Sequence, residues 1–334
     1  MTALAQPTVA SFFSGIGGFD LAFERAGFRI TTQCEIEPFC VDILTKHWPD
    51  VKRLGDIREV KDADVPVSDI WVGGFPCQDV SVARMGPRAG LKGKRSGLFY
   101  QFARLIEGSR PRIVVIENVP GLLSSHGGRD FRIVINTLAE LGYGVGWRVL
   151  NSKHFGVPQS RQRVYIVGCY RDGRGPAEIL FEPECSPRDI ATSGQDGQRV
   201  ISPFKKSFGD PLTGPIVQGI AYCLYACSAR HTGTDWSRTY VSYPDGRVRR
   251  LTPLESERVQ GFPPGWTLLD RPSVDVDKMD TLRYTALGNA VSVPVIEWLA
   301  GRTLPVLQRL RNSQVAYEAP QLSTQLRLLD AAVV

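Results

Sequence analysis

The stretch Val9-Ala10-Ser11-Phe12-Phe13-Ser14-Gly15-Ile16-Gly17-Gly18 joins two elements that decide the fold class. Residues 9–13 have the apolar character of a buried strand, and residues 18–26 have the spacing of a helix. The glycines between them let the backbone approach a ligand closely, and a helix N-terminus favours an anionic group. This strand, turn and helix predict an α/β domain with a ligand at the end of its first strand.

Strand-like and helix-like segments continue to alternate through the first 170 residues, which predicts a doubly wound, mostly parallel sheet with helices on both faces. The further expected strands are residues 28–34, 69–72, 113–116, 144–150 and 163–169. The further expected helices are residues 39–47, 98–107 and 131–141. We expect the last two strands to pair as a hairpin.

The pattern changes after residue 170. Six prolines fall between Pro176 and Pro215, and Gly, Ser and Asp interrupt every apolar run. Tyrosines and a tryptophan between residues 222 and 243 nevertheless predict some packed β structure. Helical periodicity returns at residues 251–259 and 291–310. We therefore expect a core at 1–170, a small, mainly irregular or β domain at 171–248, core-completing helices at 249–311 and a weakly ordered tail at 312–334.

Composition favours a globular cytoplasmic protein. The chain has 334 residues, 43% of them hydrophobic, a net charge of +6 and seven cysteines. We recognise no apolar run of the roughly 18 residues that a membrane span needs and no secretion leader. An odd number of cysteines in such a chain indicates free thiols. We expect a monomer. We also expect no metal site, because Cys223, Cys227 and His231 have an atypical ligand spacing.

Basic residues are concentrated in two zones. Residues 80–106 contain six Lys or Arg and no acid, and residues 199–250 contain eight Lys or Arg against three Asp. Solvated loops would have the same composition, but two basic zones also suit a polyanionic partner. The expected contacts are Arg84, Arg88, Lys92, Lys94, Arg95, Arg230 and Arg238.

Two strand ends carry the groups suited to covalent catalysis. Gly74-Phe75-Pro76-Cys77-Gln78-Asp79 follows one strand, and Glu117-Asn118-Val119 follows another. A free cysteine is most often a small buried hydrophobe, but Cys77 stands where open α/β folds place their ligands. A thiolate and a carboxyl group that meet across a cleft could attack an electrophilic ring and move a proton on it.

The other strand ends suit a nucleoside. Glu35 follows the second strand and could accept hydrogen bonds from ribose hydroxyls, and Asp56 could accept one from an adenine amino group. The glycine spacing differs from the dinucleotide fingerprint, because Asp20 stands where the last glycine is expected. This disfavours a nicotinamide cofactor.

In the order of its motifs the chain resembles the cytosine-5 DNA methyltransferases of the bacterial or phage type, from residue 11 to about residue 299. The family varies where this chain has residues 171–248, which the resemblance makes a target-recognition domain. By the same resemblance Cys77 is the nucleophile, Glu117 holds the target base, and Gln159, Arg161 and Arg163 complete the site. Residues 251–263 resemble the scaffold beneath the recognition domain.

The resemblance also implies S-adenosylmethionine as cofactor and double-stranded DNA as partner. The positions that match its cofactor site are Phe13, Gly15, Gly17, Gly18, Glu35, Ile36, Asp56, Ile57, Pro76, Leu98, Asn289 and Val291. Many members have an aromatic residue where this chain has Ile36. Thiolate addition at C6 would make C5 of cytosine nucleophilic, and the base must leave the duplex for this to happen.

Three other functions remain open at this stage. An RNA methyltransferase could share the motif order, and a silent DNA-binding protein could share the fold but would be expected to lack Cys77 or Glu117. A nicotinamide-dependent dehydrogenase is disfavoured by the glycine spacing. The sequence names neither the DNA target nor a cognate restriction enzyme.

Overall fold

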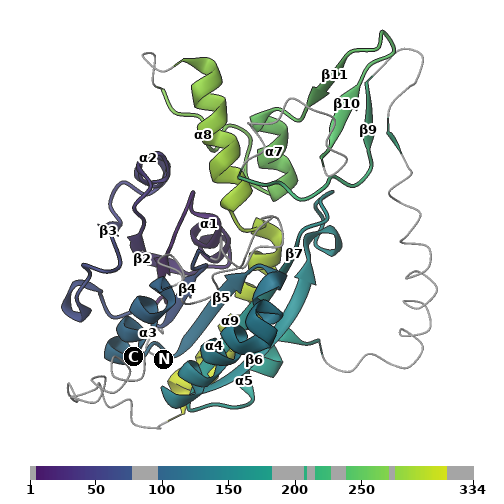
Figure 1. Cartoon of the computed structure of the whole chain (residues 1–334). Coiled ribbons are helices and arrows are strands. Elements are labelled where there is room, and N and C mark those ends of the chain that lie inside the picture. Colours follow the sequence, from purple (N-terminus) through teal and green to yellow (C-terminus); the bar gives the residue numbers. More distant parts are fainter. Residues whose placement is uncertain are drawn as a thin grey trace, which may run out of the picture.

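The computed structural model describes residues 5–76, 97–182, 207–208, 215–226, 238–270 and 275–313. Its core is a seven-stranded sheet in the order β3-β2-β1-β4-β5-β7-β6 (Figure 1). The strands are β1 Thr8–Phe12, β2 Arg29–Cys34, β3 Lys52–Leu54, β4 Ile70–Gly73, β5 Ile113–Asn118, β6 Tyr143–Asn151 and β7 Gln162–Tyr170. Strands β1 to β5 pair in parallel, while β7 is antiparallel to both β5 and β6. The mostly parallel sheet and the late hairpin are confirmed.

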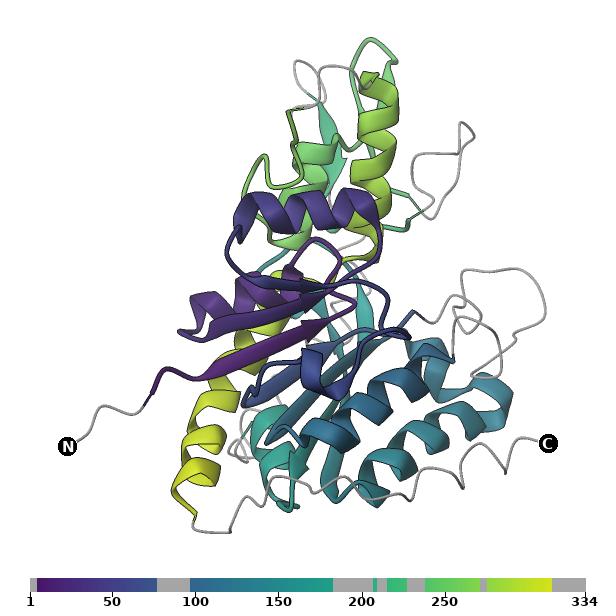
Figure 2. The same ribbon diagram turned by 90° about the vertical axis from the view of Figure 1, so that its left-hand side faces the viewer.

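Helices cover both faces of this sheet (Figure 2). One face packs against α1 Gly18–Arg25, α5 Gly175–Leu180 and α9 Val293–Asn312. The other packs against α3 Leu98–Ser109 and α4 Arg129–Glu140. Successive strand residues point to opposite faces, so Val115 joins the first cluster and Val114 and Ile116 join the second. Such a strand is apolar throughout because it is buried on both sides.

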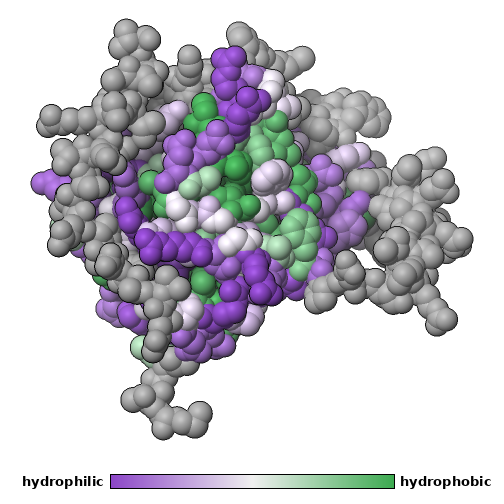
Figure 3. All heavy atoms as spheres, turned by 90° about the horizontal axis from the view of Figure 1, so that it is seen from below, coloured by the Kyte–Doolittle hydropathy of each residue, from purple (hydrophilic) through white to green (hydrophobic). Residues whose placement is uncertain are grey.

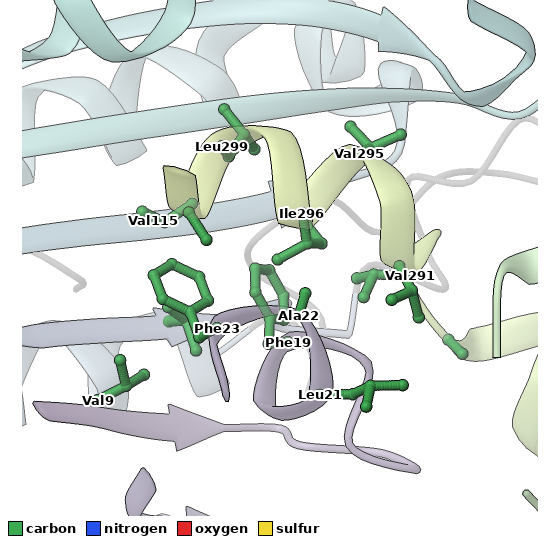
Figure 4. Close-up of a cluster of buried hydrophobic side chains, with 14 of the residues drawn as sticks. Val9, Phe19, Leu21, Ala22, Phe23, Val115, Val291, Val295, Ile296 and Leu299 are labelled. Carbon is green, nitrogen blue, oxygen red and sulfur yellow. The ribbon is translucent and has the colours of Figure 1, made fainter. Parts of the chain in front are cut away.

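The first cluster holds the beginning and the end of the chain together (Figure 4). Phe19 and Phe23 of α1 lie between the sheet and α9, where they face Ile296 and Leu299. All four side chains are buried. Helix α9 thus completes the core, although almost 270 residues separate it from α1 in the chain.

A second, smaller sheet lies at the opposite end of the molecule from the lower end of α9 (Figure 1). Its order is β11-β10-β9-β8, all antiparallel, with β8 Ser207–Phe208, β9 Ile216–Gln218, β10 Tyr240–Ser242 and β11 Val248–Arg250. Val217 and Val241 pack with Leu251 and Val259, which connects the sheet to α7 Pro253–Gln260. The expected small β domain is confirmed by this sheet.

Two local expectations were wrong. Glu117 and Asn118 belong to β5 instead of following it. Helix α8, Val276–Asn289, was not predicted, because its charged residues leave no continuous apolar stripe. It begins at Asp275, whose carboxylate accepts the amides of Asp277 and Lys278. The remaining helix, α2 Pro38–His47, was expected.

The segment Val276–Asn312 is long and apolar enough, by length and composition, to cross a membrane. It consists of two helices, α8 and α9, with a break at residues 290–292. More than half of its apolar window, 56%, is buried inside the protein, so we interpret it as core. The face of the molecule seen from below has hydrophobic residues near its middle and hydrophilic residues around them (Figure 3).

Candidate active site

An ion pair joins the ends of β5 and β7. Arg163 Nε lies 2.9 Å from Glu117 Oε1, and the two side chains are only 13% and 11% exposed. The antiparallel register sets Glu117 opposite Tyr165, and Arg163, two residues before Tyr165 in β7, faces the same side of the sheet. Burial acts against the guanidinium charge, but the Glu117 carboxylate keeps the pKa of Arg163 above its ordinary value. The two strands therefore hold the Glu117 side chain at the carboxyl end of β5, against the guanidinium of Arg163.

The end of β4 lies directly beside this acid. A Cβ added to Gly74 would be 3.2 Å from Glu117 Oε2, a tight contact that the carboxylate would have to relieve by moving a few tenths of an ångström. Asn118 Nδ2 donates to the carbonyl oxygen of Phe75 over 3.3 Å and ties β5 to the segment that leads to Pro76. Cys77 is the next residue in the chain and lies outside the described residues, as does the basic segment Arg84, Arg88, Lys92, Lys94 and Arg95.

Gln159 and Arg161 lie in the framework behind the ion pair. The amide of Gln159 donates to Val259 O and Gln260 Oε1, both over 3.1 Å, and accepts Leu224 N–H over 3.2 Å. It is fully buried. These bonds connect the residues just before β7 to Leu224 and to the end of α7.

Arg161 is a buried cation that donates its hydrogen bonds mainly to backbone carbonyl oxygens. It donates to the carbonyl oxygens of Leu224, Gly288 and Ala290 over 3.0, 3.2 and 2.8 Å. Burial lowers its pKa, and the nearby Arg163 adds to this effect. Residues 221–226 pass so close to Gly288 that a Cβ there would overlap the backbone of Tyr225 and Ala226. Arg161 thus ties this segment to the C-terminal end of α8.

Sequence reasoning gave Cys223 no place in the active site. Its sulfur lies 3.3 Å from Arg161 Nη1 and 3.9 Å from Arg163 Nη2. No motif signals this position, because the contact depends on how residues 221–226 cross the core. Two further arginines were expected to contact DNA. Arg238 is half-buried just before β10, and Arg230 lies outside the described residues. Among the described residues, no three His, Cys, Asp or Glu gather as metal ligands.

The turn after β1 is shaped by positive φ angles. Phe13, Gly15 and Gly17 have φ of 53°, 56° and 81°. Glu35, after β2, accepts the backbone N–H groups of Gly15, Ile36 and Glu37 over 2.7, 2.8 and 2.9 Å. A Cβ added to Gly15 would meet no atom within 4 Å. The turn therefore borders open space, with a fixed carboxylate beside it.

The other positions proposed for the cofactor come from several elements. A Cβ on Gly18 would lie 2.7 Å from Val291 Cγ2, so the side chain of Val291, between α8 and α9, packs closely against the start of α1. Ile57 is buried, whereas Ile36 is 60% exposed, and Asn289 is exposed too. Asp56 pairs with Arg58, which lowers the pKa of that carboxyl. Pro76, after β4, and Leu98, at the start of α3, are half-buried.

Asp20 lies beneath this turn and is fully buried. Its carboxylate accepts Ser11 Oγ–H and Gln33 Nε2–H, each over 3.0 Å. Burial raises its pKa from 3.8 to about 6, because the hydrogen bonds compensate only part of the desolvation. The residue that breaks the dinucleotide fingerprint is therefore part of the core.

The sheet order, the glycine turn after β1 and the acid at the end of β5 are those of a Rossmann-like transferase. The family model described as C-5 cytosine-specific DNA methylase matches residues 8–188 and 205–304. The chain belongs to this family, and it is a DNA (cytosine-5-)-methyltransferase.

Relatives and solved structures agree with this assignment. The chain is 31% identical over 329 residues to the type II methyltransferase M1.ScrFI of Lactococcus lactis subsp. cremoris, with 92% of this chain and 80% of that protein covered. It is 33% identical over 299 residues to the type II methyltransferase M.NgoBI of Neisseria gonorrhoeae, covering 85% and 89%. The crystal structure of S. pombe Dnmt2 methyltransferase superposes with a TM-score of 0.63 at 20% identity, covering 90% and 99%, which shows a shared fold.

Proposed function

We propose that this enzyme transfers a methyl group from S-adenosylmethionine to C5 of cytosine in one short double-stranded DNA sequence, through a covalent adduct with Cys77. The observation that carries the proposal is the buried Glu117–Arg163 pair beside Gly74. Cys77 follows Gly74 by three residues, so the thiol and the acid can serve one base. The family match supports the reaction class.

The turn after β1 fits the proposed cofactor. When bound, S-adenosylmethionine supplies an electrophilic methyl group. Glu35 would accept hydrogen bonds from the ribose hydroxyls. The backbone N–H groups that already donate to its carboxylate hold it in place for this contact. The open space beside Gly15 admits a ligand at the N-terminal end of α1, where an anionic group is favoured. Ile57 offers a buried apolar surface to the adenine, and Asn289 and Val291 would line the opposite side.

The proposed chemistry follows from the poor nucleophilicity of C5. The Cys77 thiolate adds to C6, and the displaced electron pair moves into the ring toward N3. Glu117 shares a proton with N3 and so neutralises the charge that develops there. The Arg163 guanidinium orients the Glu117 carboxylate for this contact. After methyl transfer, loss of the C5 proton restores the double bond and expels the Cys77 thiolate.

The target base has to leave the duplex before Cys77 can attack it. We propose that the basic segment Arg84 to Arg95 and the recognition residues Arg230 and Arg238 contact DNA, and that phosphate contacts offset the cost of unpairing. The proposed domains are 1–170, 171–248, 249–311 and 312–334. A cytoplasmic monomer suffices for one short target. The type II relatives favour a cognate restriction enzyme.

Expression in a host without cytosine methylation tests the proposal directly. Bisulfite sequencing of the host genome should show protected cytosines in one sequence context, and the Cys77→Ala variant should show none. This result would establish the reaction, the nucleophile and the target sequence together. Soluble wild-type protein that binds S-adenosylmethionine yet protects no cytosine would contradict it.

A further inference from the structure

The turn after α7, residues 261–268, reaches the cofactor loop from the far end of the chain. Trp266 Nε1 donates a hydrogen bond to the carbonyl oxygen of Ile16 over 2.8 Å, and both groups are buried. Ile16 lies between Gly15 and Gly17, the two left-handed glycines of the loop. A residue 250 positions away therefore holds the centre of that loop.

Trp266 is itself fixed from the side of α2. The His47 ring stacks on it with a centroid separation of 3.5 Å and an interplanar angle of 6°. His47 Nε2 donates to Trp266 O over 3.0 Å. Burial lowers the pKa of His47, which favours the neutral ring that stacks without charge. The Phe262 ring also packs against Trp266, with the two ring centroids 5.7 Å apart. Phe262 lies next to the start of α1 as well, because a Cβ placed on Gly18 would be 3.2 Å from its Cζ.

The turn is equally firmly attached to α7. Glu257 is fully buried and accepts Gly265 N–H over 2.6 Å and Thr267 N–H over 2.9 Å. Arg283 of α8 neutralises this carboxylate over 3.1 Å. These contacts join the turn to both α7 and α8. Helix α7 in turn follows β11 of the small sheet, to which the Arg249–Glu255 ion pair of 2.7 Å joins it.

We propose that Trp266 is a positioning residue for the cofactor loop. Its indole N–H fixes the Ile16 carbonyl and so holds the Gly15–Gly17 turn in the shape that receives S-adenosylmethionine. The proposal rests on the proposed cofactor and adds a residue that does not itself touch it. It also attaches the cofactor loop to the scaffold of the recognition domain.

The test compares Trp266→Phe, which keeps an aromatic ring but removes the N–H, with Trp298→Phe. Trp298 also packs on an aromatic ring, that of Phe155 at 5.5 Å, but lies on α9 away from the loop. Calorimetric titration with S-adenosylmethionine should show the Kd of Trp266→Phe raised about tenfold, because a buried carbonyl loses its donor. Trp298→Phe should bind like the wild type.

Steady-state kinetics separate positioning from mere structure. We expect the KM for S-adenosylmethionine to rise about tenfold in Trp266→Phe, with kcat at saturation unchanged, whereas partial unfolding would lower kcat and leave KM as it was. An unchanged Kd in Trp266→Phe, or an equal rise of the Kd in Trp298→Phe, would overturn the positioning role of Trp266 but leave the proposed cofactor standing. Failure of the wild type to bind would overturn the proposed cofactor as well.

A second variant covers the case in which Trp266→Phe does not fold. His47→Phe retains the stacked ring but removes the hydrogen bond to Trp266 O. We expect its Kd for S-adenosylmethionine to rise about threefold, because Trp266 is held less firmly. A folded His47→Phe protein with wild-type affinity would contradict the proposal.

Discussion

Arg163 Nε and Glu117 Oε1 lie 2.9 Å apart between two antiparallel strands, and neither side chain has much contact with solvent. A buried pair of this kind contributes little net stability, because desolvation offsets the attraction. Removal of one partner, in contrast, leaves the other charge buried and unpaired. The arrangement is thus better suited to orient a carboxylate for chemistry than to stabilise the fold.

Glu117→Gln should lower kcat about 10²- to 10⁴-fold, the usual contribution of a general acid, with DNA and cofactor affinity close to wild type. Methyl transfer from tritiated cofactor to DNA measures the rate. Circular dichroism should confirm folding, because the variant leaves Arg163 without its carboxylate. A kcat within threefold of the wild type would exclude the proposed role of Glu117.

Gly15→Ala and Gly27→Ala form a matched pair. Both glycines have a positive φ, 56° and 89°, and neither would place a Cβ within 4 Å of another atom. Each substitution should lower the free energy of unfolding by about 1–2 kcal/mol through backbone strain. Only Gly15→Ala should also weaken S-adenosylmethionine binding, since only Gly15 borders the proposed site. Equal cofactor affinity of the two variants would place the site elsewhere.

The buried Asp20 should make stability depend on pH. Its pKa is raised from 3.8 to about 6 in the folded protein, so the folded state holds the proton more tightly than the unfolded chain. The protonated Asp20 therefore contributes to the free energy of unfolding in full below about pH 4. This contribution falls as the pH rises from about 4 to about 6, and the free energy no longer depends on Asp20 titration above that. The fall is on the order of 3 kcal/mol.

Asp20→Asn removes this titration but can keep the bonds to Ser11 and Gln33. We measure the free energy of unfolding of both proteins by urea denaturation at pH 4, 5, 6 and 7. The value for the variant minus that for the wild type should increase from pH 4 to about pH 6 and stay constant above it. A constant difference across this range would show that Asp20 does not titrate there.

Reversal of two charges in the basic segment, Arg88→Glu with Lys92→Glu, should weaken DNA binding and spare the cofactor. Phosphate contacts dominate such binding, so the loss should be greatest at low salt. Fluorescence anisotropy of a labelled duplex, with cofactor titration as the control, measures both. Wild-type DNA affinity at moderate salt would show that this segment does not contact DNA.

Much of the core could be predicted from the sequence, because its strands are apolar throughout and separated by periodic helices. The end of β5 was harder to place, because a charged residue such as Glu117 is more typical of a loop than of a buried strand. Its partner, Arg163 on β7, is brought beside it only by the sheet. Helix α8 was missed because its polar residues conceal the period, and only its cap at Asp275 marks the start.

The contacts of the motif residues could be predicted only in part. Arg161 directly precedes β7 and Arg163 lies on it, and the two-residue alternation predicted that both would face one side, which agrees with their shared contact with Cys223 Sγ. The partners of Arg161, however, come from residues 224, 288 and 290, which only the folded chain brings together. For the same reason the contact between Trp266 and Ile16 has no signature in the sequence.

The crossing of residues 221–226 over Gly288 limits how the enzyme could be re-engineered. If residues 171–248 recognise the target as proposed, a new DNA specificity would be sought by grafting this segment from a relative. The backbone of Tyr225 and Ala226 leaves no space for any side chain on Gly288, and Leu224 bonds both Gln159 and Arg161. A chimera whose junction falls within residues 221–226 would break these contacts. The junctions of a graft should therefore lie outside residues 221–226.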